Sequence, residues 1–357
     1  TYYPIQWHYQ ALNLEKAWDL TTGSTAVTVA VVDSGGVNHP DLPPLQGWDF
    51  VSDVTSGGDG NGRDSDPTDV GDGSGYHGAH VAGTIGARSN NSSGVAGVNW
   101  STNLIHVRAL GKGGSGSFID ILEGIAWAAG QTVRGVPANP NPAQVINLSL
   151  GADIGVTCSE AMGGDTSLFT DLASAGVILV VAAGNSNIDA VGTFPANCPG
   201  VITVGATGPD HSRAPYSNYG STIDVMGPGG DTGQYIQVGS DFYPAGVLST
   251  VLDSSRQPIL DFMQGTSMAA PHIAGVVALM LAHTPGLSYE QVLGRLRASS
   301  WHPSCGSAQC GSGLVDAFAA ITGSDSDTPT PGNPPGGAGV TTWIDFFRYE
   351  SGTPVWE

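Results

Sequence analysis

The sequence predicts an α/β fold in which helices flank a doubly wound, mostly parallel sheet. Short apolar runs rich in β-branched residues alternate along the chain with longer segments of helical pattern. Runs that are apolar on both faces are typical of strands in a parallel sheet covered by helices. Polar residues also follow several of these runs, at the strand ends where this architecture binds its ligands.

The expected strands are the apolar runs 26–33, 104–110, 144–150, 177–183 and 201–206. The expected helices are 14–20, 77–88, 118–129, 168–175, 268–283 and 289–299. Asp33 ends the first of these strands, Ser149 lies at the end of the third, and Asn185 follows the fourth. Because the carboxyl ends of parallel strands meet at one edge of a sheet, we expect a functional site at that edge.

The organisation of the chain changes after Ile321. We expect one folded domain over residues 1–322, followed by a linker over 323–340 that is rich in Gly and Pro. Residues 341–357 form a tail with several aromatic side chains, and this tail is too short to fold alone. It either docks on the folded domain or is the remnant of a removed C-terminal module.

The charge of the chain restricts its partners. Its formal net charge is −20 and its pI is about 4.4, so it should repel nucleic acids and anionic membranes. The many carboxylates suit calcium, although solubility alone would also explain them. No run approaches the ~20 apolar residues of a membrane span. No basic and apolar leader begins at Thr1, so we expect a processed mature form.

The four cysteines lack the CxxC pairs of a zinc site, and their even number indicates two disulfides formed in an oxidising compartment. Four cysteines allow three pairings. We expect Cys158 to pair with Cys198, and Cys305 with Cys310. The longer loop would contribute ~3–4 kcal/mol in the chain-entropy description.

Three segments carry residues for nucleophilic catalysis: 31–35 (VVDSG), 77–84 (HGAHVAGT) and 265–272 (GTSMAAPH). Each has an ordinary structural explanation by itself, as a turn, a polar surface or a helix cap. Together they supply a hydroxyl, an imidazole base and a carboxylate that orients the base, which acyl transfer requires. We therefore expect Asp33, His77 and Ser267 to act as one catalytic unit.

These segments resemble the motifs of the subtilisin-like serine proteases, or subtilases, whose triad runs in the order Asp, His, Ser. The resemblance extends from about residue 6 to residue 321, and Ala79 is its one departure within the histidine motif, where many members carry threonine. It implies a subtilisin-like fold and a secreted serine endopeptidase from the bacterial, disulfide-containing branch of the family. It also implies a precursor whose prodomain is an inhibitor, protein or peptide substrates, and a monomer.

The resemblance assigns further site residues. Asn185, in the segment AAGN, would complete the oxyanion hole together with the backbone N–H of Ser267. An extended substrate would lie between two backbone edges and against small, uncharged pocket walls, which favour apolar or aromatic side chains. No carboxylate is expected at this pocket. The substrate-binding residues would be Ser149, Leu150, Gly151, Gly111 and Gly113 (in 111–116), Ala183, Gly184 and Thr193.

Calcium is the cofactor implied by the resemblance, and two sites are expected. The first would take side chains of Gln6, Asp41 and Asn91, with carbonyl groups of Ser89, Ser93 and Val95. The second would lie in the acidic stretch 49–72, because its carboxylates would repel one another without a cation; a flexible, solvated loop is the alternative. Its ligands would include Asp49, Asp59, Asp64 and Asp66.

Two other functions remain open. An inactive subtilase fold could serve as a binding module, but it would be expected to lack a triad or oxyanion residue, and none is missing. An esterase or acyltransferase would usually carry a GxSxG motif, which GTSMA at 265–269 is not.

Overall fold

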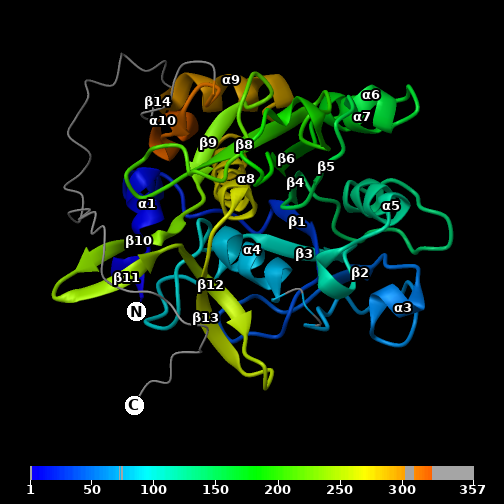
Figure 1. Cartoon of the computed structure of the whole chain (residues 1–357), viewed down its shortest axis with the longest axis horizontal. Helices are drawn as coiled ribbons and strands as arrows, with labels where there is room; N and C mark the ends of the chain where they lie inside the picture. The colour runs from blue at the N-terminus through cyan, green and yellow to red at the C-terminus, as the bar shows by residue number, and fades with distance from the viewer. Residues whose placement is uncertain (1, 72, 74, 302–308, 324–357) are drawn as a thin grey trace.

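The computed structural model describes residues 2–71, 73, 75–301 and 309–323 (Figure 1). A nine-stranded sheet has the order β14-β15-β9-β8-β6-β4-β1-β3-β2, and every neighbouring pair in it except β14–β15 is parallel. Its strands are β1 (Thr28–Asp33), β2 (Gly47–Asp49), β3 (Asn103–Arg108), β4 (Val145–Leu148), β6 (Ile178–Ala182), β8 (Val201–Thr207), β9 (Val225–Pro228), β14 (Ser300–Trp301) and β15 (Leu314–Val315). The predicted α/β fold with a mostly parallel sheet is therefore confirmed.

Helices cover both faces of this sheet. The principal ones are α4 (His77–Gly86), α5 (Phe118–Ala128), α7 (Ser167–Ser174), α8 (Thr266–His283), α9 (Tyr289–Ser299) and α10 (Ala317–Thr322). Along β1, Val29 and Val31 face the core that contains α4 and α8, whereas Ala30 and Val32 face the core that contains α5 and α7. This alternation explains why the strand is apolar at every position, since successive side chains point to opposite faces.

Helix α8 lies at the centre of the molecule (Figure 1). It is long and apolar enough to cross a membrane, but 83% of it is buried inside the protein. A helix that is apolar on all sides is the expected core element of a large domain. Its composition therefore reflects burial between the sheet and the other helices of its layer.

Several elements were not expected from the sequence. Two antiparallel hairpins are formed by β10 (Asp231–Val238) with β11 (Asp241–Ala245) and by β12 (Val247–Leu252) with β13 (Pro258–Met263). Strand β9 was also missed, because its run of four residues ends in Gly-Pro and gives no strand pattern. The remaining short elements are η1 (Tyr3–Ile5), α1 (Trp7–Ala11), α2 (Leu14–Trp18), α3 (Val54–Gly57), η2 (Lys112–Gly114), β5 (Ala152–Asp153), α6 (Cys158–Ala161), η3 (Ala190–Gly192) and β7 (Thr193–Phe194).

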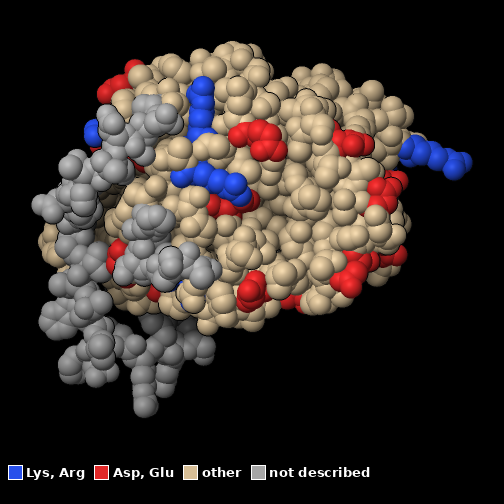
Figure 2. Space-filling model, turned by 90° about the horizontal axis from the view of Figure 1, so that it is seen from above, with Lys and Arg blue, Asp and Glu red and all other residues tan. Residues whose placement is uncertain are grey.

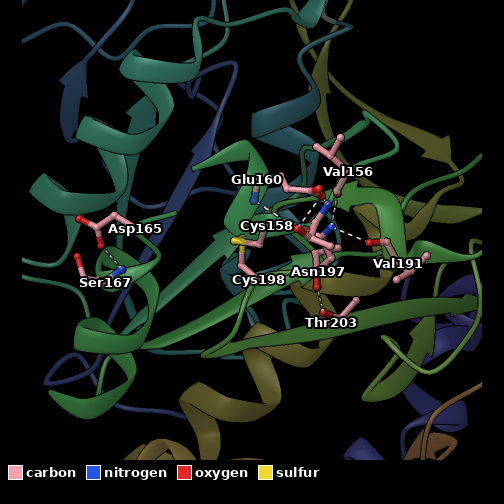
Figure 3. Close-up of a disulfide and its surroundings, with 11 residues drawn as sticks. Val156, Cys158, Glu160, Asp165, Ser167, Val191, Asn197, Cys198 and Thr203 are labelled. Atoms are coloured by element: carbon pink, nitrogen blue, oxygen red, sulfur yellow. Dashed lines mark hydrogen bonds between the residues drawn. A yellow bond between two sulfur atoms is a disulfide. The ribbon is translucent and has the colours of Figure 1, made fainter. Parts of the chain in front are cut away.

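The predicted disulfide between Cys158 and Cys198 is present, and it joins the start of α6 to the segment before β8 (Figure 3). The second predicted pair includes Cys305, which lies outside the described residues. The linker 323–340, except for its first residue, and the tail 341–357 also lie outside them. Figure 2 shows that basic side chains are few on one face of the molecule, in keeping with the net charge of −20.

Candidate active site

The first component of the site is a carboxylate–imidazole pair at the end of β1. Asp33 is fully buried, and its Oδ1 and Oδ2 atoms lie 2.9 and 3.0 Å from Nδ1 of His77. His77 is the first residue of α4, where the left-handed conformation of Tyr76 begins the helix. Because Nδ1 is held by the carboxylate, the ring keeps Nε2 for the reacting groups.

A second set of hydrogen bonds holds this pair in position. The hydroxyl of Ser34 donates to Asp69 (2.6 Å) and accepts from the backbone N–H of Gly78 (3.0 Å), which links the β1 end to α4. A Cβ atom at Gly78 would lie 2.2 Å from the carbonyl oxygen of Gly35, so a glycine is required for this close packing. These supporting residues were not singled out from the sequence.

The environment tunes the basicity of His77. Burial lowers its pKa, but the charge and hydrogen bond of Asp33, and to a lesser degree the charge of Asp69, raise it more. The net result is a pKa above the ordinary value of 6.5. A base whose pKa lies near the working pH can both accept and return a proton, as acyl transfer needs.

Ser267 stands in the first turn of α8, where the helix dipole favours negative charge. Pro271 has no N–H, so the carbonyl of Ser267 lacks its helical donor four residues on. The hydroxyl of Ser149 donates to that carbonyl instead, at 2.7 Å. Oγ of Ser267 donates to the carbonyl of Ser149 (3.2 Å), so it must rotate to meet His77.

Asn185 faces the start of the same helix. Its Oδ1 accepts hydrogen bonds from the backbone N–H of Thr266 (2.8 Å) and from the Thr266 hydroxyl (3.0 Å). Two donors on the oxygen fix the orientation of the amide, so that Nδ2 is left to donate to a ligand. Thr266 was not recognised as a positioning residue from the sequence, although it adjoins Ser267.

The residues expected to wall the substrate pocket come from three neighbouring segments. Ser149, Leu150 and Gly151 follow β4; Ala183 and Gly184 follow β6; and Thr193 lies in β7, which pairs with β5. Thr193 and Ala183 are buried, whereas Gly151 is exposed. The uncharged lining stays a prediction, and the carboxylate of Asp153 in β5 accepts a hydrogen bond from Thr193 (2.6 Å).

The other expected substrate edge, residues 111–116, folds differently from the expectation. The backbone N–H of Gly111 donates to the carbonyl of Ser115 (2.8 Å), and residues Lys112–Gly114 form a 3-10 turn. Gly113 has a φ of 67°, which permits this turn and interrupts an extended backbone. This segment is therefore a closed loop and not an extended strand edge.

The side chains expected at the first calcium site form two sets of hydrogen bonds with residues 91–96. Asp41 is almost fully buried, its Oδ2 accepts from the N–H of Val95 (2.8 Å), and Asn91 Nδ2 lies 3.4 Å from its Oδ1. Gln6 exchanges two hydrogen bonds of 2.9 Å with the backbone of Ala96. Burial raises the pKa of Asp41, and the hydrogen bonds from Val95 and Asn91 together with nearby positive charges offset this only in part. A buried carboxylate such as Asp41 suits a calcium ion, but the amide oxygens of Gln6 and Asn91 accept from the backbone N–H groups of Ala96 and Ser93, so the calcium site stays a prediction.

In the same loop, the hydroxyl of Ser89 accepts from the N–H of Gly97 (3.0 Å), and the N–H of Ser93 donates to Asn91 (3.0 Å). Left-handed φ values at Asn90, Ser92 and Gly94 curl the loop around Asp41. No group of three or more His, Cys, Asp or Glu side chains in the described part of the chain is arranged to hold a metal ion. A site here would therefore depend on amide and carbonyl oxygens for most of its ligands.

The second expected calcium cluster is replaced by ion pairing. The guanidinium of Arg108, which is buried, contacts the carboxylates of both Asp49 and Asp59 and also the carbonyl of Gly57. Asp64 instead accepts from the side chain of Asn61 (2.6 Å), and Asp66 from Thr68 N–H (3.1 Å). Asp49 and Asp59 thus converge on one arginine, 49 residues beyond Asp59, whereas Asp64 and Asp66 have other partners.

The chain belongs to the subtilase family, because the sequence profile of that family matches residues 24–318. It is 40% identical to an extracellular protease of Xanthomonas campestris pv. campestris over 94% of this chain and 59% of that protein. It is 35% identical to subtilisin Savinase of Lederbergia lenta over 88% of this chain and 98% of that protein. The chain thus spans about three-fifths of the length of its Xanthomonas relative.

A solved structure of a protease from Pseudoalteromonas arctica has the same fold. It is 41% identical, covers 90% of this chain and 98% of its own, and superposes with a TM-score of 0.81. The family expectation made from the three motifs is therefore confirmed.

Proposed function

We propose that the chain is a secreted serine endopeptidase that hydrolyses peptide bonds through an acyl-enzyme. The observation that supports this most strongly is the convergence of three segments at one edge of the sheet. The buried Asp33 holds Nδ1 of His77, Ser267 lies in the first turn of α8, and Asn185 keeps its amide nitrogen for a ligand. Relatives named as extracellular proteases support secretion.

Each of these residues has its own role in the proposed hydrolysis. The Ser267 hydroxyl turns from the Ser149 carbonyl toward Nε2 of His77, gives up its proton and attacks the scissile carbonyl. The backbone N–H of Ser267 and Nδ2 of Asn185 donate to the oxyanion. His77 returns the proton to the leaving amine, which departs and leaves the acyl-enzyme. A water molecule then releases the acyl group by the same steps in reverse order.

The substrate would lie extended along Ser149–Gly151, with the side chain before the scissile bond in the pocket beyond them. The partly buried Leu150 offers an apolar surface that favours apolar and aromatic side chains there, whereas Ala183 is fully buried and could contribute only through its backbone. A calcium ion held by Asp41, Gln6 and Asn91 would supply stability rather than chemistry. We further propose that the protein is made as a precursor with an inhibitory prodomain and acts as a monomer.

The test is hydrolysis of a chromogenic peptide with phenylalanine before the scissile bond. Wild-type protein should cleave it and Ser267→Ala should not, whereas Ser174→Ala, which changes an exposed serine of α7, should be unaffected. A serine-directed covalent inhibitor should abolish wild-type activity and label only protein that retains Ser267. If the folded wild type cleaves neither this peptide nor denatured casein, the inactive binding module is the better description.

A further inference from the structure

One carboxylate beside the substrate pocket has no role in the mechanism above. Asp153 lies in β5, where it is in register with Thr193 of β7. Its Oδ1 accepts from Thr193 Oγ1 (2.6 Å) and from Asn218 Nδ2 (3.1 Å), and its Oδ2 accepts from the hydroxyl of Ser186. Three donors from three separate segments fix the position of this carboxylate.

The donors connect Asp153 directly to the catalytic framework. Asn218 is fully buried, and its Nδ2 also lies 3.0 Å from the carbonyl of Ala183. Its Oδ1 accepts from the backbone N–H of Ser186 (3.0 Å), the residue that follows Asn185. Asp153 is therefore anchored, through Ser186 and Asn218, to the same segment that carries the proposed oxyanion donor Asn185.

Within the described ranges, no basic side chain neutralises the charge of Asp153. Asp153 is solvent-exposed. Burial raises its pKa, but the hydrogen bonds from Ser186, Thr193 and Asn218 together lower it more, so the pKa lies below its ordinary value and the group is ionised at neutral pH. A carboxylate offers about four lone-pair sites, of which three are occupied here. One remains for a ligand.

The pocket segment that carries this group is held in place. The disulfide Cys158–Cys198 closes the loop between β5 and β8, and Asn197 Nδ2 donates to the carbonyls of Val156 (2.9 Å) and Val191 (2.7 Å), as Figure 3 shows. These bonds tie the chain after Asp153 to the chain before Thr193. A rigid carboxylate loses little entropy on binding a cation.

We propose that Asp153 makes the pocket select lysine or arginine, in addition to apolar side chains, immediately before the scissile bond. The aliphatic stem of such a residue packs along the partly exposed Leu150, and its cationic head meets the free lone pair of Asp153. Aromatic side chains use the same apolar surface without that contact. This inference rests on the proposed endopeptidase function and specifies its substrate class.

The experiment compares three peptides that differ only in the residue before the scissile bond, which is lysine, norleucine or phenylalanine. Norleucine has nearly the shape of the lysine stem without its charge. For wild type, kcat/KM should be higher with lysine than with norleucine. In Asp153→Asn, kcat/KM for lysine should fall about 10- to 100-fold, as expected when a charged hydrogen bond is lost. For the norleucine and phenylalanine peptides, kcat/KM should change less than about threefold.

Asp171→Asn is the matched control, because it removes one exposed carboxylate from α7 without touching the pocket. This variant should leave kcat/KM unchanged for all three peptides. Asp153→Glu should keep part of the preference for the lysine peptide. The inference is overturned if wild type cleaves the lysine peptide no faster than the norleucine peptide. It is also overturned if Asp153→Asn slows all three peptides equally, since that is the signature of a structural role. If wild type cleaves none of the peptides, the endopeptidase proposal itself fails.

Discussion

Two buried carboxylates, at the ends of the strands on either side of β3, have different basic partners. Asp33 ends β1 and Asp49 ends β2, and both are in register with Arg108, the last residue of β3 between them. Both are fully buried. Asp33 contacts the imidazole of His77, whereas Asp49 contacts the guanidinium of Arg108.

The difference lies in what each partner can do with a proton. An imidazole gains and loses its proton near neutral pH, but a guanidinium stays charged throughout the working range of a protein. The Asp33 region can therefore carry out proton transfer, while the Asp49 region can only hold structure. Burial of a carboxylate at the ligand-binding edge is thus not sufficient for a catalytic role, because its partner decides the outcome.

The largest loss of activity is expected when the Asp33–His77 pair is broken. Asp33→Asn should lower kcat by roughly three to four orders of magnitude, because the amide cannot stabilise the imidazolium or hold the correct tautomer; asparagine at the equivalent position of the chymotrypsin triad has an effect of that size. The melting temperature should change little, since the side chains have the same shape. Rates near those of wild type would contradict the assignment of Asp33.

Breaking the second pair should affect stability instead of catalysis. Arg108→Met leaves Asp49 buried without its cation, so the free energy of unfolding in urea should fall by about 3–5 kcal/mol. Adding Asp49→Asn should recover part of this loss, and the exposed Arg134→Met is the control. The comparison fails if Arg108→Met is as stable as the control, or if its folded fraction has lost activity.

Adding a chelator extends the comparison to a third buried carboxylate, Asp41. It forms no ion pair with an arginine among the described residues, although the charge of Arg88 lowers its pKa. Excess chelator should lower the free energy of unfolding by about 2–3 kcal/mol, the size expected for an ion present at ~100 times its dissociation constant. In Asp41→Asn the chelator should have no further effect, while the exposed Asp241→Asn should respond as wild type does. Equal melting temperatures of wild type with and without chelator would contradict this site.

The smallest expected effect is on the pH dependence. Activity needs neutral His77, whose raised pKa lies above 6.5, so kcat/KM should fall about tenfold per pH unit below that pKa. Asp69 contributes to raising the pKa, so Asp69→Asn should move the midpoint to lower pH and extend activity into acid. A midpoint that stays in place would show that Asp69 acts only as a hydrogen-bond acceptor for Ser34.

The sequence predicts the central strands and the four proposed catalytic residues because each depends on a short local pattern. Asp33, for example, is marked by the apolar run that it ends. Arg108 could not be recognised as the counter-ion of Asp49, because 59 residues separate them and only the register of β2 and β3 brings them together. The contact of Asp153 with Asn218 likewise spans 65 residues. The missed residues are those whose role is set by tertiary contacts.

The disulfide between Cys158 and Cys198 also affects what happens when one copy of the proposed endopeptidase cleaves another. A secreted endopeptidase meets other copies of itself, and exposed loops rich in small residues are the preferred places of cleavage. Residues 163–165, Gly-Gly-Asp, are exposed and lie between Cys158 and Cys198. A single cut there would leave the two pieces covalently joined. The nicked molecule would keep the segments on both sides of the cut in one covalent unit. A cut at this loop would therefore not by itself separate the residues proposed for the substrate pocket.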